Sequence, residues 1–230
     1  LADIDLGPIL IEKTANYSEV LEGKNLSTLG YNSPQEALDY FSSIDLRKRS
    51  SFGIQQDLSI RGSIFEDNEV CLEGVRVNDP QTGHFNLELP LTEYDIGNIT
   101  LDSNSQRVSF NIAPPKEKGI FIKHYWGQHA LYADSVSLNF KTVNANNRIS
   151  YEHKISSGIR EDTDFNIHNL FMDSLWNWER SSINLIFGMT QRDFGADSFY
   201  SSLYPHEEEH TRQKLLLVKS NITRDKFSLV

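Results

Sequence analysis

The sequence predicts two regions of different fold class: an α+β region over residues 1–116 and antiparallel β-strands over residues 117–230. The first region combines one helix signal with short strand-like runs, whereas the second repeats runs of about ten residues in which apolar and polar side chains alternate. The pair Pro114-Pro115, followed by Lys116, Glu117 and Lys118, marks the boundary.

The composition excludes several classes of protein. The chain has 230 residues, 32 acidic and 22 basic side chains and a formal charge of −10, which argues against a nucleic-acid groove. A single cysteine, Cys71 in an apolar strand, excludes an intrachain disulfide framework and a multi-cysteine metal site. No apolar run approaches the roughly 18 residues of a membrane-spanning helix. The mean hydropathy of −0.45 suits either an acidic soluble protein or alternating barrel strands joined to a polar domain.

The clearest local signal in the first region opens a helix. Ser33-Pro34-Gln35-Glu36 combines an N-cap serine, a proline at the first helical position and a glutamate at the third. This capping box predicts a helix from Pro34 to about Ser43. A short apolar run from Gly7 to Glu12 precedes it and predicts a strand or an extended tail.

Two strand-like runs and a loop follow the helix. Asp57–Arg61 alternates with period two, and Glu69–Val77 continues in strand spacing with Gly74 as a bulge or turn. The polar segment Asn78–His84 contains Asp-Pro and Thr-Gly pairs, which mark a loop.

Four apolar rows in the second region predict strands with one apolar face. Polar breaks at 144–147, 158–164 and 179–182 separate the runs. The face points at a core in a soluble sandwich and at lipid in an outer-membrane barrel, and periodicity alone does not separate the two. The rows are Val136, Leu138 and Phe140; Ile149, Tyr151 and Ile155; Leu170, Met172, Trp176 and Trp178; and Ile183, Leu185, Phe187 and Met189.

The segment from Ser43 to Ile99 favours the barrel. It holds DLRKR, the triplet Ile60-Arg61-Gly62, LEGVRVND and NDPQTGHFNLELP, before a short run that closes on Ile96 and Ile99. This combination resembles the plug domain of TonB-dependent outer-membrane receptors. Residues 193–211 are similar to an early extracellular loop of the same family, and the Gly7–Glu12 run to the stretch that opens its plug.

The resemblance implies a fold and its extent in this chain. It implies an α+β plug domain over residues 1–116, followed by antiparallel transmembrane β-barrel strands over residues 117–230. The strands after residue 118 make five to eight at about ten residues each, whereas a barrel wide enough for a plug has about 22. We therefore expect the barrel to be incomplete here and the chain to be a fragment, a degenerate gene product or a split protein. Residues 100–116 lack the glycine-rich stretch usual in the family.

The resemblance also implies a function. Such a receptor in the Gram-negative outer membrane binds a scarce nutrient complex, such as a siderophore or cobalamin, and imports it with TonB-coupled energy. Its partners are the TonB–ExbB–ExbD complex, a small-molecule or metal-chelate ligand and outer-membrane lipid, with no cofactor and no nucleic acid. The sequence leaves the substrate open. The alternative is a soluble β-rich module that binds a carbohydrate or protein ligand without transport.

Three sets of residues are the site candidates. A polar loop could face the ligand through Asp79, Gln81, His84 and Asn86, although such side chains equally cap their own backbone. The resemblance implies a structural role in the plug for Arg61, Gly62 and Gly74; a buried Arg61 in a strand would need carboxylate partners, with ligand contact as its alternative. TonB contact is assigned to Ile9, Leu10 and Ile11, although residues 1–11 hold no unambiguous TonB box.

The histidines raise the question of a metal site. His206 and His210 flank three glutamates, a spacing that suits a divalent ion on a helix, but Pro205 and the surrounding strands favour a solvated loop without metal. His124, His129 and His153 are expected to face the lumen or a loop. The sequence holds no phosphate loop, nucleophile elbow or HExxH helix, so no enzyme is predicted.

Overall fold

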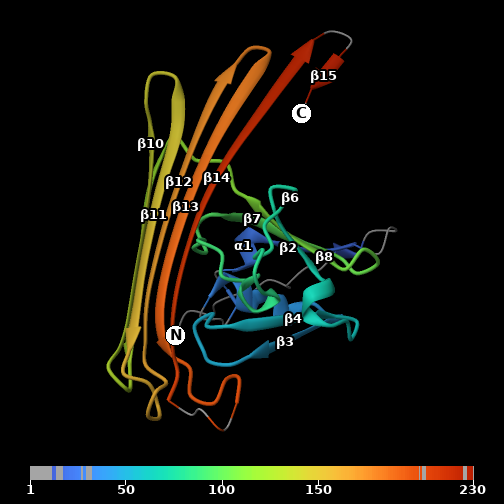
Figure 1. The fold of residues 1–230 in the computed structure, drawn as a ribbon. Coiled ribbons are helices and arrows are strands. Elements are labelled where there is room, and N and C mark those ends of the chain that lie inside the picture. Colours follow the sequence, from blue (N-terminus) through green and yellow to red (C-terminus); the bar gives the residue numbers. More distant parts are fainter. Residues whose placement is uncertain are drawn as a thin grey trace, which may run out of the picture. The chain divides into compact units, whose positions relative to one another are not determined.

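A computed structural model describes residues 12–13, 18–26, 28–29, 33–201, 203, 206–224 and 227–229 (Figure 1). The contacts between residues divide the chain into two compact units. The first unit comprises Leu1–Glu88 and Ile96–Ala113, and the second comprises Leu89–Asp95 and Pro114–Val230. Among the described residues, no helix is long and apolar enough to cross a membrane.

The first unit is built on a mixed sheet with the strand order β1-β2-β7-β8-β5-β6. Among the strands that the structure describes in this sheet, only β5 and β8 pair in parallel. Fully buried Leu21, Val70, Ile99 and Phe110 lie on four of these strands and form its core. The strands are β1 (Glu12–Lys13), β2 (Ser18–Glu22), β5 (Glu69–Leu72), β6 (Val75–Arg76), β7 (Ile96–Asp102) and β8 (Arg107–Ile112).

A separate two-stranded sheet and four short helices complete the first unit. The antiparallel pair is β3 (Ile44–Lys48) with β4 (Gln56–Ile60). The helices are α1 (Gly23–Leu26) and the 3₁₀ helices η1 (Pro34–Tyr40), η2 (Phe65–Asp67) and η3 (Gly83–Phe85).

The predicted helix forms, but not as a capping box. It begins at Pro34, as predicted, and is a 3₁₀ helix that ends at Tyr40 rather than an α-helix that ends at Ser43. The Ser33 side chain makes no capping hydrogen bond. The Glu36 carboxylate instead accepts from the Gly53 amide (3.2 Å) and the Gln56 side chain (3.5 Å), so tertiary contacts have replaced the local cap.

The second unit contains one antiparallel sheet whose strands follow each other in sequence. Connections 142–144 and 179–180 lie at one end, which we call the turn end. Connections 128–130 and 157–164 lie at the other, the loop end, together with the described residues between 196 and 207, at the bottom of Figure 1. The strands are β9 (Lys118–Gly127), β10 (Leu131–Lys141), β11 (Ala145–Ser156), β12 (Phe165–Trp178), β13 (Ser181–Gly195), β14 (Glu208–Arg224) and β15 (Phe227–Leu229).

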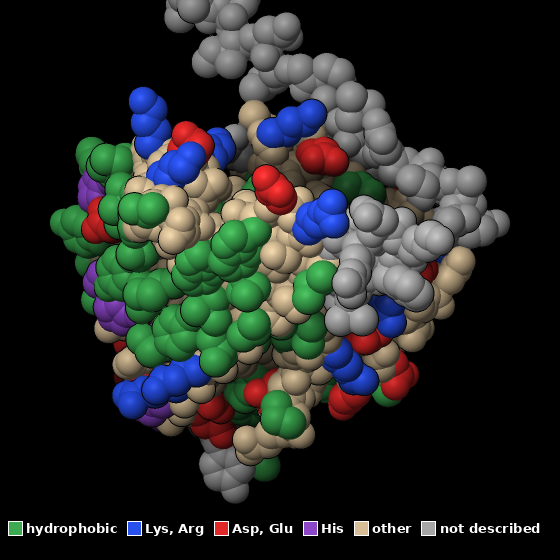
Figure 2. Space-filling model, turned by 90° about the horizontal axis from the view of Figure 1, so that it is seen from above, with side chains coloured by type: hydrophobic (Ala, Val, Ile, Leu, Met, Phe, Trp, Pro, Cys, Tyr) green, Lys and Arg blue, Asp and Glu red, His purple; other side chains and the backbone are tan. Residues whose placement is uncertain are grey.

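The register places the four predicted apolar rows on one face of this sheet. Leu138 pairs with Ile149, Ile149 with Met172, and Met172 with Phe187. This apolar face is largely exposed, with Leu138 at 41% and Leu216 at 66%. On β10 to β13 the opposite face is largely buried and carries small or charged side chains such as Ser137, Ser150 and Arg192. In Figure 2, hydrophobic and histidine side chains gather together along the side formed by the sheet.

Candidate functional site

In the predicted ligand loop of the first unit, the side chains of Asp79 and Asn86 bind the backbone of the loop itself. Asp79 accepts hydrogen bonds from the amides of Gln81 (2.8 Å) and Thr82 (3.0 Å), and Asn86 accepts one from the Asp79 amide (2.9 Å). His84 Nδ1 lies 2.7 Å from Asp57 Oδ1. Of the four candidates only Gln81 is exposed, and a ligand role for this set stays a prediction.

The residues predicted to be structural in the plug lie in turns. The expectation of Arg61 in a strand is wrong, because β4 ends at Ile60 and Ser63 closes a turn by accepting from the Ile60 amide (3.0 Å). Arg61, with φ of 53°, is exposed and donates to Asn104 (3.2 Å). Gly62 and Gly74 have φ of 78° and 81°, which glycine adopts without strain. Ile9, Leu10 and Ile11 lie outside the described residues.

Segment 89–95 belongs to the second unit, although the chain before and after it belongs to the first. Its local shape is a turn closed by Asp95, whose Oδ2 accepts from both the amide and the hydroxyl of Thr92 at 2.8 Å. Leu91, Thr92 and Asp95 are fully buried. The predicted boundary at residue 116 assigned this segment to the first region, whereas its contacts are with the second unit.

Arg148 on β11 binds segment 89–95 through both side-chain and main-chain oxygens. Its Nε lies 3.1 Å from Asp95 Oδ1, and its Nη atoms donate to the carbonyls of Tyr94 (3.2 Å) and Asp95 (3.5 Å). Nη2 also donates to Asp173 Oδ2 on β12 at 3.1 Å. Ser150 adds a 2.6 Å hydrogen bond to Asp95 Oδ1. We call Asp95, Arg148 and Asp173 the arginine clamp.

The arginine clamp is almost completely excluded from solvent. The side chains of Arg148, Asp95 and Asp173 are 3%, 0% and 0% exposed, and the guanidinium lies 5.5 Å from the centre of the Phe171 ring. Burial raises the pKa of the Asp95 carboxyl, and Arg148, Ser150 and Thr92 oppose that shift by stabilising its charged form.

Packing reinforces these polar contacts at both ends of the segment. A Cβ built on Gly188 would lie 2.5 Å from Pro90 Cγ, so only glycine lets the proline approach β13 this closely. Tyr94 stacks on Phe121 at 5.4 Å between ring centres, and Lys123 Nζ lies 3.0 Å from Glu93 Oε2.

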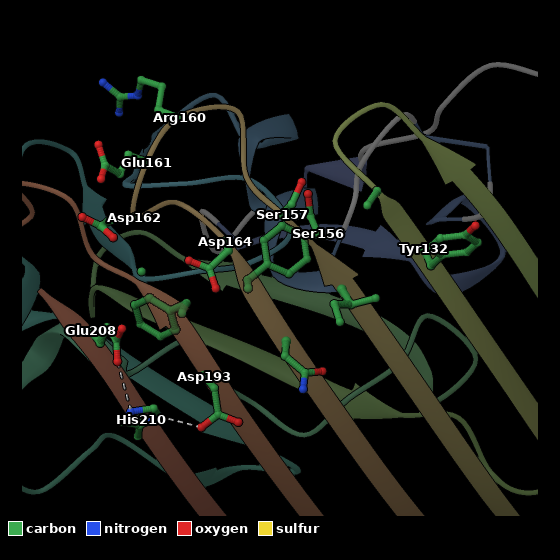
Figure 3. A pocket seen from close by; sticks show the side chains of 16 residues that line it. Tyr132, Ser156, Ser157, Arg160, Glu161, Asp162, Asp164, Asp193, Glu208 and His210 are labelled. Atoms are coloured by element: carbon green, nitrogen blue, oxygen red, sulfur yellow. Dashed lines mark hydrogen bonds and ion pairs between the residues drawn. The ribbon is translucent and has the colours of Figure 1, made fainter. Parts of the chain in front are cut away.

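A second candidate site is an open pocket of about 680 Å³ at the loop end (Figure 3). Five carboxylates surround it, together with the aromatic rings of Tyr132, Phe165 and Phe194. His210 Nδ1 lies 2.8 Å from Asp193 Oδ1, and Nε2 lies 3.9 Å from Glu208 Oε2. The carboxylates are those of Glu161, Asp162, Asp164, Asp193 and Glu208.

The two histidines of the His206–His210 motif contact different partners. His206 pairs with Asp162, while His210 lies in β14, so the helical spacing considered for a metal site does not form. One potential ligand atom each from Glu161, Asp162 and His206 lie within 4.8 Å of one another and could hold a divalent ion. The Asp162 carboxylate raises the pKa of His206.

Two further histidines lie where the sequence analysis did not expect them. His124 and His153 are on the apolar face near the loop end, because β9 and β11 pair with their neighbours in the register that carries the apolar rows. His124 Nδ1 lies 2.5 Å from Asp134 Oδ1, and His153 stacks on His168 at 4.3 Å. His129 lies in the loop 128–130, as predicted.

The fold of the chain resembles several solved structures. No protein-family model and no curated protein matches it. The ferric citrate transporter FecA superposes with a TM-score of 0.74 at 15% identity, covering 93% of this chain and 38% of FecA. The siderophore receptor PirA from Pseudomonas aeruginosa gives 0.68 at 11% identity, covering 94% and 39%. The copper transporter OprC gives 0.73 at 10% identity, covering 95% and 36%.

These neighbours are receptors and transporters, not enzymes. The chain spans between 36% and 39% of their length, so it corresponds to part of each of them. At these identities the likeness concerns the fold. The predicted resemblance is confirmed at that level: this chain has the fold of a part of the TonB-dependent receptors.

Proposed function

We propose that the chain is part of an outer-membrane receptor that binds a metal or metal-chelate nutrient and imports it with TonB-coupled energy. The observation that carries this proposal is the two-faced sheet of the second unit, with exposed apolar side chains on one face and buried polar ones on the other. A soluble protein rarely leaves a contiguous apolar face of this kind uncovered.

The apolar face has the dimensions of a membrane band. Trp126 and Tyr132 lie near its loop end and are 73% and 53% exposed, while Trp178, 52% exposed, lies at its turn end. From His168 to Trp178 the chain makes ten residue steps, about 34 Å along a strand. Tilted by about 40°, this length spans about 26 Å, against about 25 Å for the apolar band of an outer-membrane barrel with aromatic side chains at both interfaces.

In this proposal the described sheet is the first part of a barrel wall, and the first unit is the plug. The division at residues 116 and 117 is then the border between plug and wall, with segment 89–95 as an addition to the wall. The ligand class follows from the neighbours, whose names specify ferric citrate, a siderophore and copper. TonB–ExbB–ExbD is the proposed energy source, with contact through Ile9, Leu10 and Ile11.

A pair of arginine substitutions separates this proposal from the soluble-module alternative. Leu138 is 41% exposed in the middle of the apolar face, and Val143 is 95% exposed in the connection at the turn end. In a membrane, Leu138→Arg costs about 2–4 kcal/mol of the free energy of unfolding, whereas Val143→Arg near the interface costs about 0–1 kcal/mol. In a soluble module, both changes cost within about 0.5 kcal/mol.

The measurement uses the full-length protein, refolded into phospholipid vesicles and unfolded with guanidinium. Equal, small costs for the two variants contradict the receptor proposal, as does recovery of the protein in a soluble fraction without detergent. Uptake of radiolabelled iron chelates or copper by cells with and without TonB then tests the ligand class and the energy source.

A further inference from the structure

We propose that segment 89–95 is a fixed strap: it stays bound to the sheet when the first unit is remodelled, and Arg148 holds it there. The physical claim concerns the second unit alone. Its consequence for transport rests on the proposed function.

Removing segment 89–95 from the sheet would be energetically costly. Arg148 and Asp173 are 3% and 0% exposed, and Asp95 is the partner that segment 89–95 brings to them. Taking away one partner of a buried ion pair leaves an uncompensated charge in a medium of low dielectric constant, which is strongly unfavourable. Release would therefore separate Arg148 from three oxygen acceptors at once, namely the Asp95 carboxylate and the carbonyls of Tyr94 and Asp95.

Segment 89–95 cannot rotate away from the sheet while the arginine clamp is intact. Asp95 is bound from both sides, by Thr92 within the segment and by Arg148 and Ser150 on the sheet. The same carboxylate therefore closes the turn at 92–95 and attaches that turn to the sheet. At the other end Pro90 packs against Gly188, in a contact that only a residue without a Cβ allows.

The chain on either side of segment 89–95 lies in the first unit. Segment 89–95 continues into the first unit at both ends, through Glu88 and Ile96. A fixed strap therefore divides that unit into a part before residue 89 and a part after residue 95. Along the backbone, a pull applied near the N-terminus would reach the first part and stop at the strap, so it would act on residues 96–113 only through the pairing of β2 with β7 and of β5 with β8.

Hydrogen exchange on the full-length protein in lipid vesicles tests the strap directly. In urea concentrations that open peptides from residues 69–88, we expect peptides covering residues 89–95 to exchange at least 100-fold more slowly. Arg148→Met should remove that protection, by a factor on the order of 100 to 1,000. Arg160→Met is the matched control, since Arg160 forms an ion pair with Asp197 (3.8 Å) at 69% exposure and should leave the strap protected.

Two results would overturn the proposal: equal exchange of residues 69–88 and 89–95 in the unchanged protein, or slow exchange of the strap in Arg148→Met. Asp95→Asn provides a second variant in case Arg148→Met does not fold. It keeps the size of the side chain but removes its charge. As for Arg148→Met, we expect residues 89–95 to lose protection from exchange.

A crosslink tests whether the strap stays in place during transport. A Cβ built on Gly188 lies 3.1 Å from Pro90 Cβ, close to the about 3.5–4.5 Å of a disulfide, so Pro90→Cys with Gly188→Cys should crosslink on oxidation. We expect oxidised and reduced forms of this double variant to take up the nutrient equally. Loss of uptake on oxidation alone would show that the strap must leave. No uptake even by the unchanged protein would count against the proposed receptor function, while the exchange experiment would still decide on the strap.

Discussion

Two ionic contacts in the second unit use similar groups in opposite environments. In the arginine clamp, Arg148 lies between Asp95 and Asp173, and no side chain is more than 3% exposed. At the loop end, His206 pairs with Asp162 at 71% and 30% exposure. Both contacts join segments far apart in sequence. Only the first excludes water.

The difference indicates two kinds of attachment within one sheet. Exposed ion pairs contribute about 0–1 kcal/mol, because water and salt screen them, and they open easily. A buried pair adds little net stability relative to an apolar replacement, but losing one partner is costly. The clamp therefore suits a permanent junction, and the pair at the loop end suits an adjustable contact between loops.

The largest expected effect comes from removing the clamp's carboxylate in segment 89–95. Asp95→Ala leaves Arg148 with one fewer anionic partner and takes the acceptor from Thr92 and Ser150. We expect the free energy of unfolding to fall by about 3–5 kcal/mol. Chemical unfolding of the full-length protein in vesicles measures this loss, and a cost below about 1 kcal/mol would show that the clamp holds nothing.

A smaller effect tests the packing beside the clamp. The added Cβ of Gly188→Ala would meet Pro90 Cγ at 2.5 Å, so we expect a loss of about 1–3 kcal/mol from the strain of moving segment 89–95. Gly119→Ala on β9 is the control, because its Cβ would meet nothing closer than 3.5 Å. The same unfolding assay compares the two, and equal effects would contradict tight packing of the segment.

This contrast also explains what the sequence could predict. Period-two alternation identified the apolar face correctly, because side-chain direction along a strand is local information. Leu138, Ile149, Met172 and Phe187 were therefore placed correctly in their rows. The glycine and polar residues of 158–164 likewise predict a loop, because they too are a local signal.

The clamp has no such local signal. Asp95 and Arg148 are 53 residues apart, and Arg148 occupies a polar position of an alternating run, where any hydrophilic side chain would fit the pattern. Similarly, Ser33 and Glu36 match the sequence pattern of a capping box, but in the structure the Glu36 carboxylate binds Gly53 and Gln56. The alternation showed which face is polar, but not which segment covers it.

A third prediction concerns an ion pair whose exposure to solvent lies between that of the arginine clamp and that of the His206–Asp162 pair. Lys123 and Glu93 lie 3.0 Å apart with 44% and 14% of their side chains exposed, also joining segment 89–95 to the sheet. We expect Lys123→Met to cost about 0.2–1 kcal/mol, since solvent screens the lysine. Exchange rates of residues 89–95 should rise only a few-fold. A loss as large as that of Asp95→Ala would mean that the clamp is not what holds the segment.

The smallest effect is the pH dependence of the contact at the loop end. Asp162 raises the pKa of His206 above its ordinary value of 6.5, so the folded contact favours the protonated ring. By linkage, this stabilisation is fully present below the unfolded pKa and disappears as the pH rises through the raised folded pKa. Loops 157–164 and 196–207 should therefore separate more readily above that pKa than at pH 5. The protection of the Asp197 amide, which donates to the Asp162 carbonyl at 3.1 Å, reports the opening; it is the hydrogen-exchange rate relative to that of a free amide at the same pH. His206→Gln should abolish the pH dependence between pH 5 and 8 while the arginine clamp stays protected, and a change at the clamp over that range would contradict the contrast between the two contacts.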